Sequence, residues 1–140
     1  MFGVVLQIHS LLRWLLLAAL VARIGRAGVG LVQKSAYGDL DRRLSLVLVI
    51  LTDLQVSLGL VVWATSPTVR QAFADPGAAM KNSALRLLFV EHPITMIVGA
   101  VLIHVAHAIG KRAPLDRSPN TKVLVLTMIA LILMLSRIPW

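Results

Sequence analysis

The sequence predicts an all-α fold, an integral membrane four-helix up-down bundle with both termini on the outer side. Of its 140 residues, 58% are hydrophobic and only 14% are charged, which is unlike the composition of soluble domains. Four apolar segments, roughly 3–22, 44–65, 84–109 and 123–138, each approach the ~20 residues that span a hydrocarbon core. We therefore expect a single transmembrane domain over residues 1–140.

The first two helices follow from their flanking residues. Nothing basic precedes the first apolar segment, and no small-residue cleavage pattern closes it before Arg23. We therefore expect a retained helix over 3–22 rather than a signal peptide. The second helix, over 44–65, follows the segment SAYGDLDRR, in which Asp41 is the expected N-cap.

Residues that interrupt a helix are found in the later segments of the sequence. The stretch PTVRQAFA, residues 67–74, predicts a short amphipathic helix at the interface, stopped by the D-P-G sequence that follows. Within the third segment, Pro93 removes the hydrogen bond to the Phe89 carbonyl, which predicts a kink. The fourth helix follows RAPLDRSPNTK, where Asn120 or Thr121 is the expected cap.

The basic residues predict the orientation of the chain. A net charge of +8 would suggest nucleic acid in a soluble protein, but here the positive residues lie in loops, so we expect a lipid bilayer as partner and no nucleic acid. Nine lie on one side: Arg23, Arg26, Lys34, Arg42, Arg43, Lys111, Arg112, Arg117 and Lys122. Four lie on the other: Arg70, Lys81, Arg86 and Arg137. The side with nine is expected to be cytoplasmic, which leaves both termini outside.

Ionisable residues at membrane depth are costly and suggest a functional site by default. At about 1.5 Å per residue, His9 and Arg13 lie ~9 Å and ~15 Å below the outer end of the first helix. Asp53 lies ~14 Å from the inner end of the second helix, so we expect Arg13 and Asp53 to pair near mid-membrane. Glu91 and His92 lie ~10 to 12 Å in, level with His9.

A purely structural interpretation of these groups stays open. Gln55 lies about 200° around the helix from Asp53 and so faces elsewhere. Together with Glu91, these two residues form a polar cluster in the outer half of the bundle, where Arg137 also returns at the end of the fourth helix. Such a cluster could compensate Arg13 and fix the register of the helices without any ligand.

The residue types in the outer half could also hold zinc or non-haem iron, but the spacing argues against a metal ion. Adjacent Glu91 and His92 are about 100° apart on a helix and do not aim at one ion. His104 and His107 share a face, yet no second helix is expected to offer a ligand at their depth. We interpret both as interfacial or helix-C-terminal histidines. Without cysteine, thioether-linked haem and thiolate metal sites are excluded.

A b-type haem fits the pattern better, because it takes two imidazoles from different helices at one depth. His9 and His92 meet that condition, and in an up-down bundle the first and third helices are diagonal neighbours. Gly99 lies seven residues after His92 on the same face, where it would leave room for a macrocycle. Arg13 or Arg137 could hold the propionates. A quinone is a second candidate cofactor.

Several motifs together resemble a known family. They are H-S-L-L-R-W at 9–14, D-L-Q-x-x-x-G at 53–59, V-E-H-P at 90–93 and R-I-P-W at 137–140. The set is similar to small bacterial four-helix membrane proteins that carry a cytochrome-b-like label, and the similarity spans nearly the whole chain. The resemblance implies haem at His9 and His92, and a multi-pass protein of the bacterial inner membrane.

The function we expect is therefore a small b-type-cytochrome-like protein with one bis-His haem b in the outer half. It would act as an electron carrier or quinone-reactive subunit rather than a stand-alone enzyme. The alternative is a haem-free accessory subunit that docks other subunits of a larger membrane complex, or further copies of itself. A third possibility is a small transporter or proton path through Arg13, Asp53 and Glu91, which would need a polar route in the cytoplasmic half as well.

Overall fold

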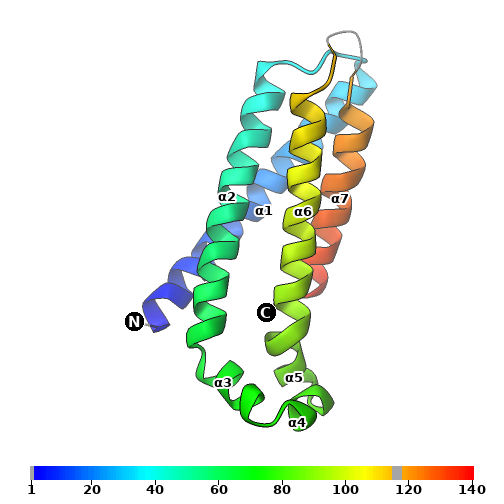
Figure 1. Ribbon diagram of the computed structural model, residues 1–140. Helices are drawn as coiled ribbons and strands as arrows, with labels where there is room; N and C mark the ends of the chain where they lie inside the picture. The colour runs from blue at the N-terminus through cyan, green and yellow to red at the C-terminus, as the bar shows by residue number, and fades with distance from the viewer. Residues whose placement is uncertain (1, 115–117) are drawn as a thin grey trace.

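The computed structural model describes residues 2–114 and 118–140, which form helices and their connections (Figure 1). The four longest helices run side by side: α1 (Phe2–Val32), α2 (Asp39–Thr65), α6 (His92–Lys111) and α7 (Asn120–Ser136). Three short helices and a π-helical turn connect α2 to α6: α3 (Pro67–Ala74), α4 (Pro76–Lys81), α5 (Ser83–Arg86) and η1 (Leu87–Glu91).

The long helices pack as a closed ring. Both α1 and α6 pack against α2 and α7, so α1 and α6 lie diagonally across the bundle, as an up-down order requires. The connection at residues 33–38 marks one end, which we call the loop end, and α3, α4 and α5 form the opposite cap end (Figure 1). The central core contains Leu16, Leu20, Leu48, Ile103, Ala130 and Met134.

The surface is that of a membrane protein. Among the described residues, three helical runs are long and apolar enough to cross a bilayer, namely Phe2–Val32, Asp39–Thr65 and Ser83–Lys111, while α7 is a shorter apolar helix. Large apolar side chains are exposed on the outward faces of all four long helices, among them Leu11, Leu15, Val47, Ile94, Val101 and Ile132. Water would not tolerate so continuous an apolar surface, whereas lipid does.

The boundary between the first two helices differs from the prediction. α1 does not end near residue 22 but continues to Val32, and α2 begins at Asp39 rather than near Leu44. Asp41 is therefore not an N-cap: it lies inside the first turn of α2, where its Oδ2 accepts a hydrogen bond from the Gly38 N–H at 3.1 Å. The arginine that was expected in a loop, Arg23, is instead buried inside α1.

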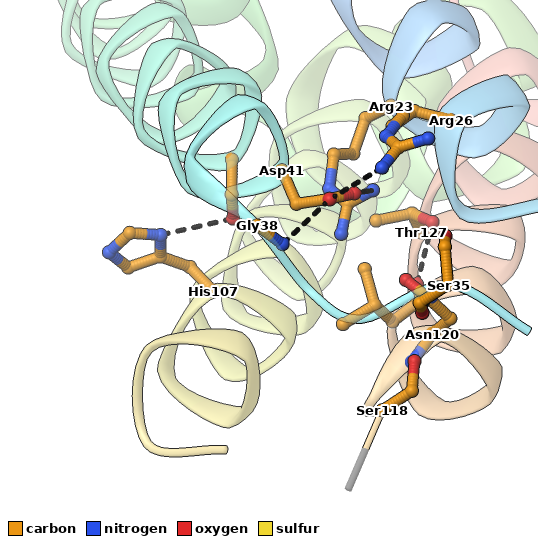
Figure 2. A network of polar contacts seen from close by, with 11 residues as sticks. Arg23, Arg26, Ser35, Gly38, Asp41, His107, Ser118, Asn120 and Thr127 are labelled. Carbon is orange, nitrogen blue, oxygen red and sulfur yellow. Dashed lines mark hydrogen bonds and ion pairs between the residues drawn. The ribbon is translucent and has the colours of Figure 1, made fainter. Parts of the chain in front are cut away.

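Figure 2 shows why a buried arginine is tolerated at the loop end. The side chains of Arg23 and Asp41 are both only 1% exposed, with Nη1 and Oδ1 3.6 Å apart. Arg26 Nη2 donates to the other oxygen, Oδ2, at 3.0 Å. The Arg23 guanidinium also lies 5.2 Å from the ring centroid of Tyr37, which packs against Gly110 of α6. One carboxylate thus compensates two cations, with an aromatic face beside them.

The start of α7 also corrects a prediction. Neither Asn120 nor Thr121 caps the helix, because α7 begins at Asn120 itself and is preceded by Pro119. Asn120 is buried, and its Nδ2 donates to the Ser35 carbonyl in the loop before α2 at 3.5 Å. The residue expected to cap the start of the fourth helix therefore ties α7 to the first interhelix loop.

The cap end confirms the short helix that the sequence predicted and contains an irregular helical turn next to Pro93. α3 covers the PTVRQAFA stretch and ends at the D-P-G sequence. Before Pro93 the helix widens into the π-helical turn η1, and the Phe89 carbonyl accepts a hydrogen bond from Trp63 Nε1 at 3.0 Å. The Phe73 ring lies edge-on to Trp63 and to Phe89, with centroids 5.4 Å and 4.9 Å apart. These aromatic contacts hold α3 against α2 and η1.

Candidate functional site

The two histidines that the sequence placed at one depth do meet. His9 of α1 and His92 of η1–α6 have ring centroids 6.5 Å apart, with the planes nearly perpendicular at 85°. They border a cavity of about 160 Å³ in the half of the bundle toward the cap end. Its wall is largely apolar, and its lining includes Leu6, His9, Ser10, Arg13, Gln55, Gly59, Trp63, His92, Pro93, Met96, Met134 and Ile138.

His92 is held by the chain's C-terminal residues. Its Nδ1 donates to the Arg137 carbonyl at 2.8 Å, because a carbonyl oxygen can only accept. The Arg137 side chain turns elsewhere: its Nε lies 3.3 Å from Glu91 Oε2, while Arg86 Nε donates to Glu91 Oε1 at 2.7 Å. Glu91 therefore pairs with both Arg86 and Arg137, and Arg137 does not line the cavity.

His9 is held by Gln55, which faces the cavity from α2. Gln55 Nε2 donates to the His9 carbonyl at 3.1 Å and lies 3.4 Å from His9 Nε2. An amide nitrogen can only donate, so His9 Nε2 accepts and its Nδ1 carries the proton in the neutral ring. Gly59, one turn beyond Gln55, allows the close approach, because a Cβ there would lie 3.0 Å from His9 Cε1.

Arg13 lies beside the cavity but not beside Asp53. Its guanidinium carbon is 5.3 Å from the Trp14 ring centroid and 5.6 Å from that of Trp140. The two indole rings are themselves 6.2 Å apart, so the cation is held by aromatic faces near the C-terminal residues.

The predicted Arg13–Asp53 ion pair is wrong. Asp53 points outward from the bundle, and its Oδ1 lies 3.1 Å from His104 Nε2 on α6. His104 is therefore not an isolated interfacial histidine, since a second helix does offer a group at its depth. Asp53, Gln55 and Glu91 consequently do not form one cluster. Asp53 pairs with His104 on the outward face, Gln55 lines the cavity, and Glu91 forms a salt bridge at the cap end.

Gly99 does not leave room for a macrocycle. It is buried, and the space next to it is taken by Met134 of α7, since a Cβ at Gly99 would lie 2.8 Å from Met134 Cε and 3.1 Å from Cγ. This glycine serves the close packing of α6 on α7 and does not border the cavity.

The residues around the cavity fit a haem only in part. A metal ion between two histidines forms metal–nitrogen bonds of about 2 Å each. The sum of two such bonds and half an imidazole ring on each side is close to the distance between the ring centroids of His9 and His92. His92 also donates its Nδ1–H to a carbonyl, as axial histidines commonly do. The cavity, however, measures about 160 Å³, below the roughly 300–1,000 Å³ of pockets for drug-sized ligands, and suits a single ring better than a macrocycle.

Three residues that line this cavity each carry a buried polar atom without a hydrogen-bond partner in the described part of the chain. His9 Nδ1, Arg13 Nε and Gln55 Oε1 are all buried and have no hydrogen-bond partner among the described residues. Two are donors and one is an acceptor, and leaving such groups unpaired costs about 1–3 kcal/mol each. A ligand that carries both a carbonyl and a hydroxyl group would satisfy them.

Trp63 lines the cavity, although the sequence did not predict it as a site residue. The signal was its spacing: Gln55, Gly59 and Trp63 follow one another at four-residue intervals, which puts all three on one face of α2. No group of three or more His, Asp or Glu side chains within residues 2–114 and 118–140 is arranged to hold a metal ion. Comparisons with protein-family models, curated proteins and solved structures find no match to this chain.

Proposed function

We propose that the protein is a small membrane subunit that binds the ring of a quinone-class molecule in the cavity between His9 and His92. The observation that carries the proposal is that three residues lining an otherwise apolar cavity each carry a buried polar atom without a hydrogen-bond partner among the described residues. Binding sites for small molecules are mostly apolar, with a few polar groups that fix orientation. A quinone or quinol ring is flat and lipid-soluble and carries oxygens at opposite edges.

The polar atoms define how such a ring would be oriented. The His9 Nδ1–H and the Arg13 Nε–H can donate to a quinone carbonyl, and Gln55 Oε1 can accept from a quinol hydroxyl. His92 keeps its Nδ1–H on the Arg137 carbonyl, which leaves its Nε2 as an acceptor when the ring is neutral. Both oxidation states of the ligand therefore find partners, which supports a quinone-reactive subunit of an electron-transfer complex.

We expect His9→Leu and Gln55→Leu each to weaken binding of a short-chain ubiquinone about two- to tenfold, since each removes a hydrogen-bonding group worth about 0.5–1.5 kcal/mol. Gly59→Leu should abolish binding, because the new side chain would displace His9 and fill the cavity. Binding is measured in detergent by quenching of tryptophan fluorescence, to which Trp63 in the cavity wall contributes.

The matched control is Thr52→Val, which removes a buried hydroxyl from the same helix without touching the cavity. Its affinity should equal that of the wild type, and unchanged affinity in His9→Leu and Gln55→Leu would refute the quinone site. The absorption spectrum of protein purified from haem-replete cells tests the second candidate, which the separation of the histidine rings favours. A Soret band lost in His9→Leu and His92→Leu but kept in His104→Leu would replace the quinone site with a haem b.

We also propose that all four long helices cross a bacterial inner membrane, with both termini and α3–α5 outside. The distribution of basic residues along the sequence supports this orientation, since nine fall between the first and second or between the third and fourth apolar segments and four fall on the other side. Reporter fusions after Trp140 and between Ser66 and Ser83 should therefore be active on the outside. A fusion near Tyr37 should be active only in the cytoplasm. A cytoplasmic signal from the Trp140 fusion would contradict this topology.

A further inference from the structure

A second polar site lies on the opposite side of α2 from the cavity. Asp53 and His104 meet near the middle of the bundle's length, with Oδ1 and Nε2 3.1 Å apart. Both side chains face outward, 57% and 46% exposed, between exposed apolar neighbours such as Val101 and Val105 on α6. In a bilayer this surface contacts hydrocarbon, where an ionisable group is expensive and usually functional.

The hydrogen bonds of His104 fix how many protons the pair holds. His104 Nδ1 lies 2.9 Å from the Ala100 carbonyl, which can only accept, so Nδ1 keeps its hydrogen. The contact with Asp53 then holds one further proton, on the carboxyl group or on Nε2. With this proton the pair has no net charge, whereas loss of the proton leaves one negative charge next to lipid. In hydrocarbon, an arrangement of the pair without formal charges costs less than two separated charges.

The charged groups on the adjoining helices make other contacts or lie at the loop end. On α1, which packs against α2, Arg13 lies between two indole rings and Arg23 beside Asp41. On α7, which packs against α6, Lys122 is in the first turn at the loop end. The titratable groups that share α6 with His104 on the side of the loop end are His107 and Lys111.

Polar side chains continue from the pair toward the loop end. His107, one turn beyond His104, has its Nδ1 3.0 Å from Ser45 Oγ on α2 (Figure 2). The α2–α6 contact thus carries hydroxyl, imidazole and carboxyl groups between the loop end and the middle of the bundle.

We propose that Asp53 and His104 form a lipid-facing proton-binding site, in which Asp53 carries the proton and His104 accepts its hydrogen bond. The site is independent of the cavity, because Gln55 faces the cavity from the other side of α2. One proton binds and leaves without any electron transfer, so the step needs no co-reactant. The protein thereby gains a site for proton uptake that does not depend on what the cavity binds.

The test uses dicyclohexylcarbodiimide, which modifies carboxyl groups that are protonated and in contact with lipid. The full-length protein in liposomes is treated at neutral pH, and adducts are located by mass spectrometry of peptides. We expect an adduct on Asp53 and none on Glu91, whose carboxylate is bound by Arg86 and Arg137. An unmodified Asp53 in the wild type would overturn the proposal.

Two variants at one position test the contact itself. His104→Arg places a fixed positive charge beside Asp53 and should ionise it, which lowers modification at least about tenfold. His104→Leu removes the imidazole without adding charge and should leave Asp53 modified. His104→Lys serves as a second cationic variant if the larger guanidinium prevents folding. Equal modification of the cationic variants and of His104→Leu would overturn the role of His104.

Discussion

Replacing Asp41 with asparagine is expected to lower the free energy of unfolding by about 3–5 kcal/mol. Asp41 compensates both Arg23, which is 1% exposed, and Arg26. Asparagine keeps the size of the side chain but removes its charge, so the Arg23 guanidinium would be buried without a counter-charge. Denaturation in detergent, followed by circular dichroism, measures the loss.

Two further variants separate the charge from other effects of the substitution. Asp39→Asn removes an exposed carboxylate two residues earlier and should change stability by less than about 0.5 kcal/mol. Combining Arg23→Gln with Asp41→Asn removes both buried charges and should recover part of the loss. If the double variant loses the sum of the two single losses, Arg23 and Asp41 do not act as partners.

Gly110→Val is the second substitution with a large expected effect. A Cβ at Gly110 would run into the hydroxyl and ring of Tyr37, which also forms the aromatic face beside Arg23. Overpacking of this kind costs about 1–3 kcal/mol. The same denaturation experiment measures it.

The matched control is Gly25→Val in α1, where no neighbouring atom lies within 4 Å of a new Cβ. That variant should be at least as stable as the wild type, because glycine is a poor residue inside a helix. Equal stabilities of the two valine variants would mean that the contact between Gly110 and Tyr37 is not tight.

The sequence predicted how deep a residue lies along its helix, but not the direction in which its side chain points. The rise of a helix placed His9 and His92 at one level, and their rings do meet. The same arithmetic placed Asp53 level with Arg13, but it could not say which face of α2 points inward. In a soluble helix the apolar stripe answers that question, whereas lipid and core are equally apolar and leave no stripe. Gln55 therefore faces the cavity, and Asp53 faces outward to His104.

The helix boundaries failed for a different reason. Arg23 looked like the start of a loop because a charged residue after an apolar run usually lies at the membrane surface. The counter-charge of Arg23 is Asp41, which lies eighteen positions further along the chain, and no local sequence pattern indicates such a pairing. The prediction for Asn120 failed for the same reason, because its side chain donates a hydrogen bond to the loop before α2 and does not cap its own helix.

The pairing of Arg23 and Arg26 with Asp41 also bears on how the chain is made. All three residues lie in the first two long helices, so they are synthesised before α6 and α7 exist. A nascent chain assembles its N-terminal part first, and this hairpin can neutralise its buried charges as soon as α2 begins to form. The helices that are synthesised later then meet a partner whose most costly polar contacts are already made.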